Sequence, residues 1–361
     1  VERYCPALYN VEDCPLASVE SAPFTCVNPD EFALYTPAQY ADPEFPYVPF
    51  GAHPLRWTAM EDLLTGEACF APAAMVFVPY IHDTDGGEKP IAPQISTGLA
   101  THTMPAQAAV SSICEIIERD AFTITWQAML ARPHIRTETL SPRNRDLVKR
   151  FARPGSSVTL LDLRMDHGVP AILAVLRSEA AQAPALVFAA AAHLDPEEAV
   201  RKSLEELALT RWFSRGIRAE LSAFVPAPDW KNVASLKHHA HVYYDHANTG
   251  LADFLFQSSR RIAFDEIENV SAGDPVRDLE MLVKRVAALN HRILLADVTT
   301  DDIRQLGLSV VRAVIPGFHP LFMGHRFRAL GGRRLWEVPQ RLGYKGITRA
   351  TGDNPAPHPF P

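Results

Sequence analysis

Two glutamates, Glu115 and Glu118, lie three residues apart in a stretch with helical character, and Arg119 follows directly. Residues three apart share one face of a helix, so this spacing brings two hard oxygen ligands and a cation to one place. Carboxylate oxygens suit a divalent cation such as Mg²⁺, which in turn suits phosphate. The ordinary alternative is a solvated helix face, because Glu and Arg are strong helix formers.

Three neighbouring features favour the metal interpretation. A glycine-containing loop at residues 96–98 leads into the helix, and Gln107 falls near the same face, eight residues before Glu115. The surrounding residues are small, so neighbouring elements can approach closely. A partly buried carboxylate pair needs compensating positive charge, which a metal ion supplies.

Other charged residues are weaker candidates. Arg312 interrupts a very apolar stretch at residues 308–315. A buried arginine in a strand must find an anion. The alternative is an edge strand on which Arg312 faces water. Glu2 and Arg3 repeat the Glu-Arg dipeptide of the central helix and could belong to a second helix sharing a metal pair. For Glu205 and Glu206 a surface pair is favoured.

Conventional catalytic motifs are missing from the sequence. It contains no GxSxG elbow, no Walker A loop and no HExxH motif. Cys114 is expected in the core rather than as a nucleophile, because no catalytic histidine accompanies it. For His102 the sequence favours neither a role in the site nor a structural role.

The elements that would position these residues alternate between helix and strand. We expect a central helix from Pro105 to about Pro133, with Thr103 as a possible cap and an apolar stripe that leaves Glu115 and Glu118 outside it. Further helices are expected at residues 57–64, 196–213, 279–288 and 300–306. Strands are expected at residues 74–80, 158–163, 171–176, 185–191, 293–298 and 308–315. This alternation predicts a mixed α/β (α+β) fold in a single domain, residues 1–361, with a mixed sheet and packed helices.

Composition limits the class of protein. The 361 residues carry a net charge of −7 and no basic block, which argues against nucleic acid as a partner. No apolar stretch has the length of a membrane span, so no membrane partner is expected. The five cysteines lack CxxC spacing and are expected to be reduced thiols in a cytoplasmic protein.

The two ends of the chain are unusual. Residues 1–5 contain neither Met nor a capping residue and read as the interior of a helix, so we expect natural N-terminal sequence to precede Val1. Residues 335–361 are expected to form an extended tail, in which proline alternates strictly from Pro355 to Pro361. Such a tail is a stiff polyproline II segment that can place a terminal carboxylate at one fixed spot.

Four stretches together resemble the YcaO family, and within it the azoline-forming cyclodehydratases (D-protein type) of thiazole/oxazole-modified peptide biosynthesis. They are residues 96–102, the helix segment 115–122, the segment from Asp297 to Gly317, and the proline-rich ending at residues 354–361. The helix and the ending are specific in combination, whereas either alone would be weak.

The resemblance implies an ATP- and Mg²⁺-dependent enzyme that acts on a ribosomal precursor peptide. Cys, Ser or Thr side chains would attack the preceding carbonyl, ATP would phosphorylate the amide oxygen, and elimination of phosphate would leave thiazolines or oxazolines. The metal ligands implied by position are Glu2, Gln107, Glu115 and Glu118. The nucleotide contacts implied are Arg3, Thr103, Arg119 and Arg312. Pro361 would supply its terminal carboxylate as the general base.

The resemblance also implies partners, and it leaves alternatives. An E1-like or leader-peptide-binding protein would deliver the substrate, and an FMN-dependent dehydrogenase would oxidise azolines to azoles. Gln107 departs from the family pattern, which has a glutamate there, and the N-terminal ATP-contacting segment is absent. These two departures are consistent with a catalytically inactive scaffold, which is one alternative. A thioamide-forming YcaO enzyme working with TfuA is another, although the proline tail argues against it.

Overall fold

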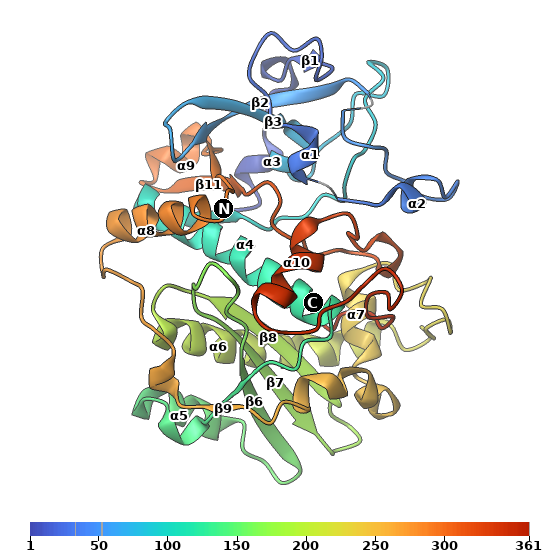
Figure 1. The fold of residues 1–361 in the computed structure, drawn as a ribbon, viewed down its shortest axis with the longest axis vertical. Coiled ribbons are helices and arrows are strands. Elements are labelled where there is room, and N and C mark those ends of the chain that lie inside the picture. The colour runs from blue at the N-terminus through green and yellow to red at the C-terminus, as the bar shows by residue number, and fades with distance from the viewer. Residues whose placement is uncertain (33, 52, 361) are drawn as a thin grey trace. The chain divides into compact units, whose positions relative to one another are not determined.

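The computed structural model describes residues 1–32, 34–51 and 53–360. The chain forms two compact units: unit 1 comprises Val1–Ile116, Ser271–Pro320 and Ala329–Arg333, and unit 2 comprises Ile117–Val270, Leu321–Arg328 and Arg334–Pro361. Each unit combines a sheet with helices (Figure 1), so the predicted mixed α/β class is confirmed. Helix α4 (Pro105–Gln127) contributes residues to both units.

The sheet of unit 1 is antiparallel. Its strand order is β1-β2-β10-β11-β4, and β3 also pairs with β2. The strands are β1 (Leu16–Ala17), β2 (Leu55–Asp62), β3 (Ala68–Pro72), β4 (Leu99–His102), β10 (Leu294–Asp297) and β11 (Ser309–Val314). The last two confirm the strands expected near residues 293–298 and 308–315. β11 is an interior strand, with β10 on one side and β4 on the other.

Unit 1 also contains helices and 3-10 turns. They are α1 (Pro29–Phe32), α2 (Pro37–Tyr40), α3 (Ala73–Val76), α8 (Pro275–Ala287) and α9 (Asp301–Gln305), together with the 3-10 turns Cys5–Ala7 and Val11–Asp13. The helices expected at 279–288 and 300–306 are confirmed as α8 and α9.

Three expectations for unit 1 are wrong. The helix expected at 57–64 is strand β2, where buried Leu55 and Trp57 alternate with less buried neighbours, and ladders to β3 and β10 override the helical propensity. The strand expected at 74–80 contains helix α3 instead; Pro79 removes a donor that a central strand would need. Residues 2–4 form a turn rather than helix interior, followed by the 3-10 turn at Cys5–Ala7.

The sheet of unit 2 has the order β8-β7-β6-β5-β9, in which only β5 and β9 pair in parallel among the described strands. The strands are β5 (His134–Ile135), β6 (Ser156–Asp162), β7 (Ala171–Ser178), β8 (Leu186–Ala192) and β9 (Arg261–Ile262). The hairpin expected between residues 158 and 176 is confirmed as β6–β7, with Gly168 at φ +70° in its turn. β8 was also expected, and it ends the sheet.

Helix α6 covers one face of this sheet. It runs over Pro196–Glu220, with Asp195 as its cap and Pro196 in the first turn. Figure 1 shows the helix lying against the strands of this sheet. Its apolar residues form one core with residues of β6, β7 and β8. The helix continues past residue 213, where its end was expected, and through Gly216, since an interior glycine costs only about 1 kcal/mol. The other helices are α5 (Pro142–Arg150), α7 (Leu236–Val242) and α10 (Arg333–Arg341), with 3-10 segments Thr137–Thr139, His246–Phe256, Phe264–Glu266 and His325–Phe327.

Helix α10 differs from the expectation of an extended tail that begins at residue 335. Gly331 and Gly332 before it and Pro339 within it masked the pattern, but buried Leu335 and Val338 lie on one helical face. Among the residues that the structure describes, no helix is long and apolar enough to cross a membrane. All five cysteines are free thiols.

Candidate functional site

Helix α4 carries the predicted carboxylates. Its expected apolar stripe is confirmed: Ala109, Ile113, Ile117, Ala121 and Ile124 are buried, and only Ile116 is partly exposed. Glu115 and Glu118 lie outside this stripe, about 4.5 Å apart along the helix axis. Both are neither buried nor fully exposed. A carboxylate in such surroundings can reach a ligand without being freely solvated.

In unit 1, the loop before β4 fixes the Glu115 carboxylate. The N–H of Gly98 donates to Glu115 Oε2 over 3.0 Å. Gly98 has φ +87°, and a Cβ there would lie 2.6 Å from the carbonyl oxygen of Ala313. Only glycine satisfies both the dihedral and the close approach. The glycine loop and the glutamate that the sequence singled out are therefore brought together.

Ser112 fastens α4 to the sheet of unit 1. This fully buried hydroxyl donates to the carbonyl of Gly98 and accepts from the N–H of Ala313 over 2.9 Å. One side chain thus joins α4, the loop before β4 and strand β11. The carboxylate of Glu115 lies one turn further along the same helix, so the contact fixes its height above the sheet.

Arg312 lies on interior strand β11 and is buried, which excludes the edge position left open by the sequence. Its Nε and Nη2 donate to the carbonyls of Met75 and Ile95 over 3.0 and 2.9 Å. Its Nη1 is buried without a hydrogen-bond partner among the described residues. Burial lowers the pKa of Arg312 to about 10, against the opposing effect of Glu115. A buried guanidinium with one unused nitrogen is suited to an incoming anion.

Glu2 lies within the electrostatic reach of Glu115. Burial and the Glu115 carboxylate raise the pKa of Glu2, while Arg3 opposes this shift. Two carboxylates that disfavour each other's charge form a place where a cation is stabilising. Among residues 1–32, 34–51 and 53–360, no group of three or more His, Cys, Asp or Glu side chains is arranged to hold a metal ion.

The remaining residues assigned to unit 1 are less constrained. Thr103 is exposed, and its hydroxyl lies 3.5 Å from His102 Nδ1, which also accepts the N–H of Met104. Gln107 is partly exposed in the first turn of α4. The rise of an α-helix separates Gln107 from Glu115 by about 12 Å, so they would more readily serve different ions than share one.

In unit 2, Glu118 and Arg119 form a partly buried ion pair with a 3.5 Å separation, and their side chains are 12% and 18% exposed. The guanidinium of Arg119 lies over the ring of Phe360, 4.3 Å from its centroid. Phe360 also packs against Phe122 of α4. The proline-rich ending therefore lies on the same helical segment as the predicted ligand Glu118.

Hydrogen bonds hold this ending along its length. Trp126 Nε1 donates to the carbonyl of Ala356, and Tyr243 donates to that of Pro357. The His358 carbonyl contacts His239 Nδ1 over 2.8 Å, and residues 356–360 are buried. Burial lowers the pKa of His358 to about 3, so this histidine is neutral. Pro361, the expected general base, lies outside the described residues.

A pocket of about 440 Å³ adjoins Glu118 and Arg119 within unit 2. It is lined by Phe360, by the β8 residues from Phe188 to Ala191, and by α6 side chains that include Lys202, Glu205 and Glu206. The surface pair favoured for Glu205 and Glu206 thus borders a cavity. Sequence spacing could not indicate this, because α6 and α4 are distant along the chain.

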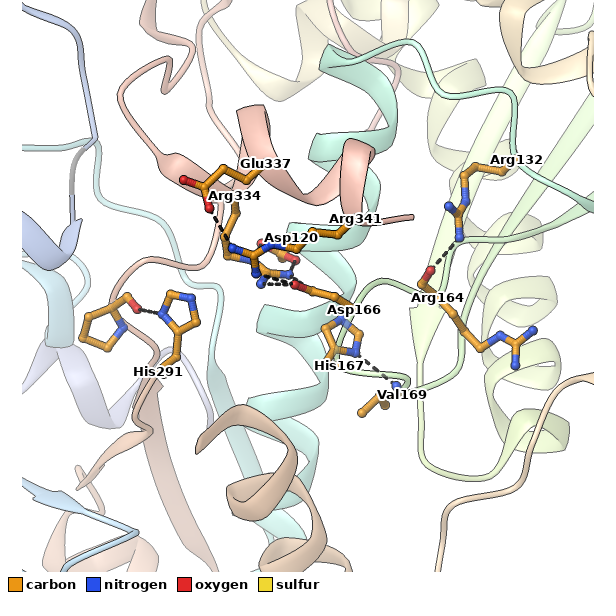
Figure 2. A network of polar contacts seen from close by, with 11 residues as sticks. Asp120, Arg132, Arg164, Asp166, His167, Val169, His291, Arg334, Glu337 and Arg341 are labelled. Carbon is orange, nitrogen blue, oxygen red and sulfur yellow. Dashed lines mark hydrogen bonds and ion pairs between the residues drawn. The ribbon is translucent and has the colours of Figure 1, made fainter. Parts of the chain in front are cut away.

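Sequence reasoning also missed Arg334. Figure 2 shows its guanidinium between Asp120 and Asp166. Arg334 Nε and Nη2 donate to the two Asp120 oxygens over 2.8 and 2.7 Å, and Nη2 donates to Asp166 over 2.8 Å. These carboxylates raise the pKa of Arg334 despite its burial. Asp120 follows Arg119 directly, so the network holds the part of α4 that carries Glu118.

Some residues of unit 1 could contact a metal-bound nucleotide. Glu2 and Glu115, which interact electrostatically, are the carboxylates that could offer hard oxygen ligands. The unused nitrogen of Arg312 supplies a donor for a phosphate oxygen. Both features lie in unit 1 and require no conventional phosphate loop.

Two curated relatives share sequence with the chain. An uncharacterized protein of Methanothermobacter thermautotrophicus is 28% identical over 290 residues, which cover 76% of this chain and 70% of the relative. An uncharacterized protein in the tfuA 3′ region of Rhizobium leguminosarum bv. trifolii is 30% identical over 132 residues, covering 35% of this chain and 30% of the relative.

Solved structures share the fold. The heterocyclase TruD matches 99% of this chain with a TM-score of 0.78 and 22% identity, although the chain spans only 49% of its length. The YcaO protein of Methanopyrus kandleri, bound with AMPPCP and Mg²⁺, matches 88% of this chain and 72% of its own, with a TM-score of 0.61 and 21% identity. The E. coli microcin synthetase McbBCD complex with pro-MccB17 bound gives a TM-score of 0.52 at 13% identity, covering 85% and 74%.

The family model described as YcaO cyclodehydratase, ATP- and Mg²⁺-binding, matches residues 1–319. This range contains both glutamates of α4, the glycine loop and Arg312. The chain therefore belongs to the YcaO cyclodehydratase family, an enzyme family that binds ATP and Mg²⁺.

Proposed function

We propose that this protein uses ATP to cyclodehydrate Cys, Ser or Thr residues of a ribosomally made precursor peptide, forming thiazolines or oxazolines. The observation that carries the proposal is the buried proline-rich ending, whose Phe360 lies on Arg119 beside Glu118. A tail held by hydrogen bonds along its length is a positioned element, as the proposed cyclisation chemistry requires.

The chemical difficulty is the amide oxygen, which is a poor leaving group. The substrate side chain attacks the preceding carbonyl carbon, and the resulting oxygen takes the γ-phosphoryl group of ATP. Loss of phosphate and a proton then leaves the five-membered ring. Phosphoryl transfer depends mainly on positioning and electrostatic stabilisation, so it can proceed without covalent catalysis by the protein.

Each side chain has a proposed role in this reaction. When bound, Mg²⁺ would neutralise charge on the transferring phosphoryl group. The proposed Mg²⁺ ligands are Glu2, Gln107, Glu115 and Glu118. Because about 12 Å of helix separates Gln107 from Glu115, they would be divided among more than one ion. Arg312 would donate its unused Nη1 to a phosphate, and Arg3, Thr103 and Arg119 are the other proposed nucleotide contacts. The base expected at Pro361 remains a prediction.

Partners are part of the proposal. The McbBCD structure contains partner proteins and a bound pro-peptide, and by analogy a leader-binding or E1-like protein would present the substrate here. An FMN-dependent dehydrogenase would act afterwards if azoles are the final product.

A second candidate is thioamide formation, favoured by the relative encoded in a tfuA 3′ region. The two reactions differ in product mass: cyclodehydration removes one water per ring, whereas thioamidation exchanges an oxygen for sulfur. Co-expression of the chain with the peptide and neighbouring genes of its locus, followed by mass spectrometry, separates them.

Phosphate release tests whether the chain is an enzyme or a scaffold. We expect release that requires the peptide, Mg²⁺ and ATP together, and that is lost in Glu118→Ala. A purified complex that binds the peptide but releases no phosphate would favour the catalytically inactive scaffold.

A further inference from the structure

Strand β8 leaves one edge of the unit 2 sheet without a partner strand. The sheet ends at β8, which pairs only with β7. At its beginning the edge is covered, because the N–H of Leu186 donates to the carbonyl of Tyr243. Because its partner lies outside the sheet, the Leu186 N–H points away from β7.

The N–H groups of successive residues in a strand point to opposite sides, so the direction of the Leu186 N–H fixes the directions of the others. The N–H groups of Leu186, Phe188 and Ala190 point to the free edge, and those between them point to β7. Among the described residues, no backbone or side-chain group bonds to the N–H of Phe188 or Ala190. These are main-chain donors aligned for another strand, and the accompanying carbonyls are acceptors.

The free edge lies in the 440 Å³ pocket between two helices. Residues Phe188 to Ala191 form its floor, with Glu118 and Arg119 of α4 and Lys202 and Glu206 of α6 among the other lining residues. The floor residues are only 1–5% exposed, so the strand is recessed below its walls. The run of alanines keeps the space beside the backbone open.

Two charges at this pocket have no ion-pair partner within the described part of the chain. The side chains of Lys202 and Glu206, one turn apart on α6, form no ion pair or hydrogen bond with another described residue, whereas Glu205 pairs with Arg201. Two unpaired side chains of opposite sign suit a polar ligand that offers both charge types or neutral hydrogen-bonding groups.

We propose that this pocket binds an extended segment of the substrate peptide as an added strand on β8. The inference rests on the proposed function and names how that substrate is held. Main-chain hydrogen bonds would give sequence-tolerant affinity, while side-chain contacts would give preference.

The added strand has a defined orientation of side chains. Residues of even number on β8 face the side of Trp126 and Tyr243, because Phe188 contacts both rings. Val187 and Ala189 face the core beneath α6. Alternate residues of the peptide would therefore point toward Glu118 and Arg119 on one side and toward α6 on the other.

A flexible peptide fits this edge better than a folded partner. A second copy would need to bring its own edge strand together with its covering layers, whereas the pocket between α4 and α6 has a volume of only about 440 Å³. A single extended chain carries no covering layer and can enter from the open side.

The test uses the complete chain with its partner proteins and, as probe, the fluorescein-labelled precursor peptide encoded at its locus. Ala190→Pro removes one edge donor without touching the β7 ladder, and Ala190→Ser keeps that donor as the matched control. We expect Ala190→Pro to bind the peptide about tenfold more weakly, as loss of one main-chain hydrogen bond predicts. Ala190→Ser should bind like the unsubstituted chain, and both should retain Mg·ATP affinity by calorimetry.

Deuterium exchange of the unsubstituted chain gives a readout independent of the variants' folding. Saturating peptide should slow exchange at Phe188 and Ala190. Unchanged exchange at both residues, absence of peptide binding, or undiminished binding by folded Ala190→Pro would each overturn the proposal. A dimer in sedimentation velocity that Ala190→Pro dissociates would place a second copy there and also overturn it.

The outcomes separate this inference from the proposed function. Protection of the two amides without loss of water from the peptide would support the pocket and contradict the cyclodehydration. Ring formation without protection of the two amides would support the cyclodehydration and contradict binding at the pocket.

Discussion

Replacing Arg334 by methionine should destabilise unit 2 strongly. The Arg334 side chain is 4% exposed and its partner Asp120 is fully buried. Four donor contacts tie Arg334 to Asp120 and Asp166, at 2.7 to 3.3 Å. Methionine keeps much of the volume but leaves the Asp120 carboxylate buried without this cation.

The expected loss is about 3–5 kcal/mol in the free energy of unfolding, because removing one partner strands the other charge. Arg341→Met is the matched control. Arg341 contacts the same Asp166 over 3.3 Å, but its side chain is 51% exposed. An exposed pair of this kind contributes about 0–1 kcal/mol.

Urea titration followed by circular dichroism measures both variants, with the slope of the transition checked for constancy. The double variant Asp120→Asn/Arg334→Met removes the stranded charge and should be more stable than Arg334→Met alone, since coupled neighbours are not additive. The reasoning is refuted if Arg334→Met costs no more than Arg341→Met, or if the double variant recovers nothing.

Three further expectations follow from the site. Glu118→Ala should abolish turnover with little change in the urea midpoint, because the residue lies outside the apolar stripe. Glu280→Ala, at an exposed position, is the control. Normal turnover by Glu118→Ala would contradict the assignment of Glu118 as a metal ligand. Ser112→Ala should cost about 0.5–1.5 kcal/mol per lost hydrogen bond, because the Ala313 N–H and the Gly98 carbonyl remain bonded to each other; urea titration measures the loss, and an unchanged midpoint would mean that the hydroxyl does not fasten α4. His358 and His325 have pKa values lowered to about 3 by burial, below the unfolded value near 6.5, so the unfolded chain binds more protons in between. The free energy of unfolding should therefore fall as pH decreases from about 6.5 toward 3, by up to about 1.4 kcal/mol per pH unit for each histidine, and a flat profile in urea titrations across this window would contradict their burial as neutral groups.

Periodic elements could be predicted from the sequence because their burial is a local pattern. The apolar stripe of α4, the β6–β7 hairpin and the cap of α6 at Asp195 each lie within a short window. At strand β2 the local propensity predicts a helix, and the ladders with β3 and β10 decide the outcome. These ladders join segments far apart in the chain.

The same limit applies to the candidate site. The contact of Gly98 with Glu115 spans 17 residues, and the glycine loop before the helix hinted at it. The bond of Arg334 to Asp120 spans 214 residues and left no pattern, because α10 begins after two glycines and contains a proline. The free edge of β8 depends on the strand order, which no local window contains.

Helix α4 depends on these distant contacts for its precision. A helix fixes the spacing of Glu115 and Glu118, but nothing in its own sequence fixes their direction. In unit 1, Ser112 supplies that constraint through Gly98 and Ala313. In unit 2, Arg334 supplies it through Asp120, since two hydrogen bonds to one carboxylate restrict rotation of the helix about its axis. A site that relies on carboxylates rather than a phosphate loop needs such buried polar fastening, because metal ligands must be held within a few tenths of an ångström.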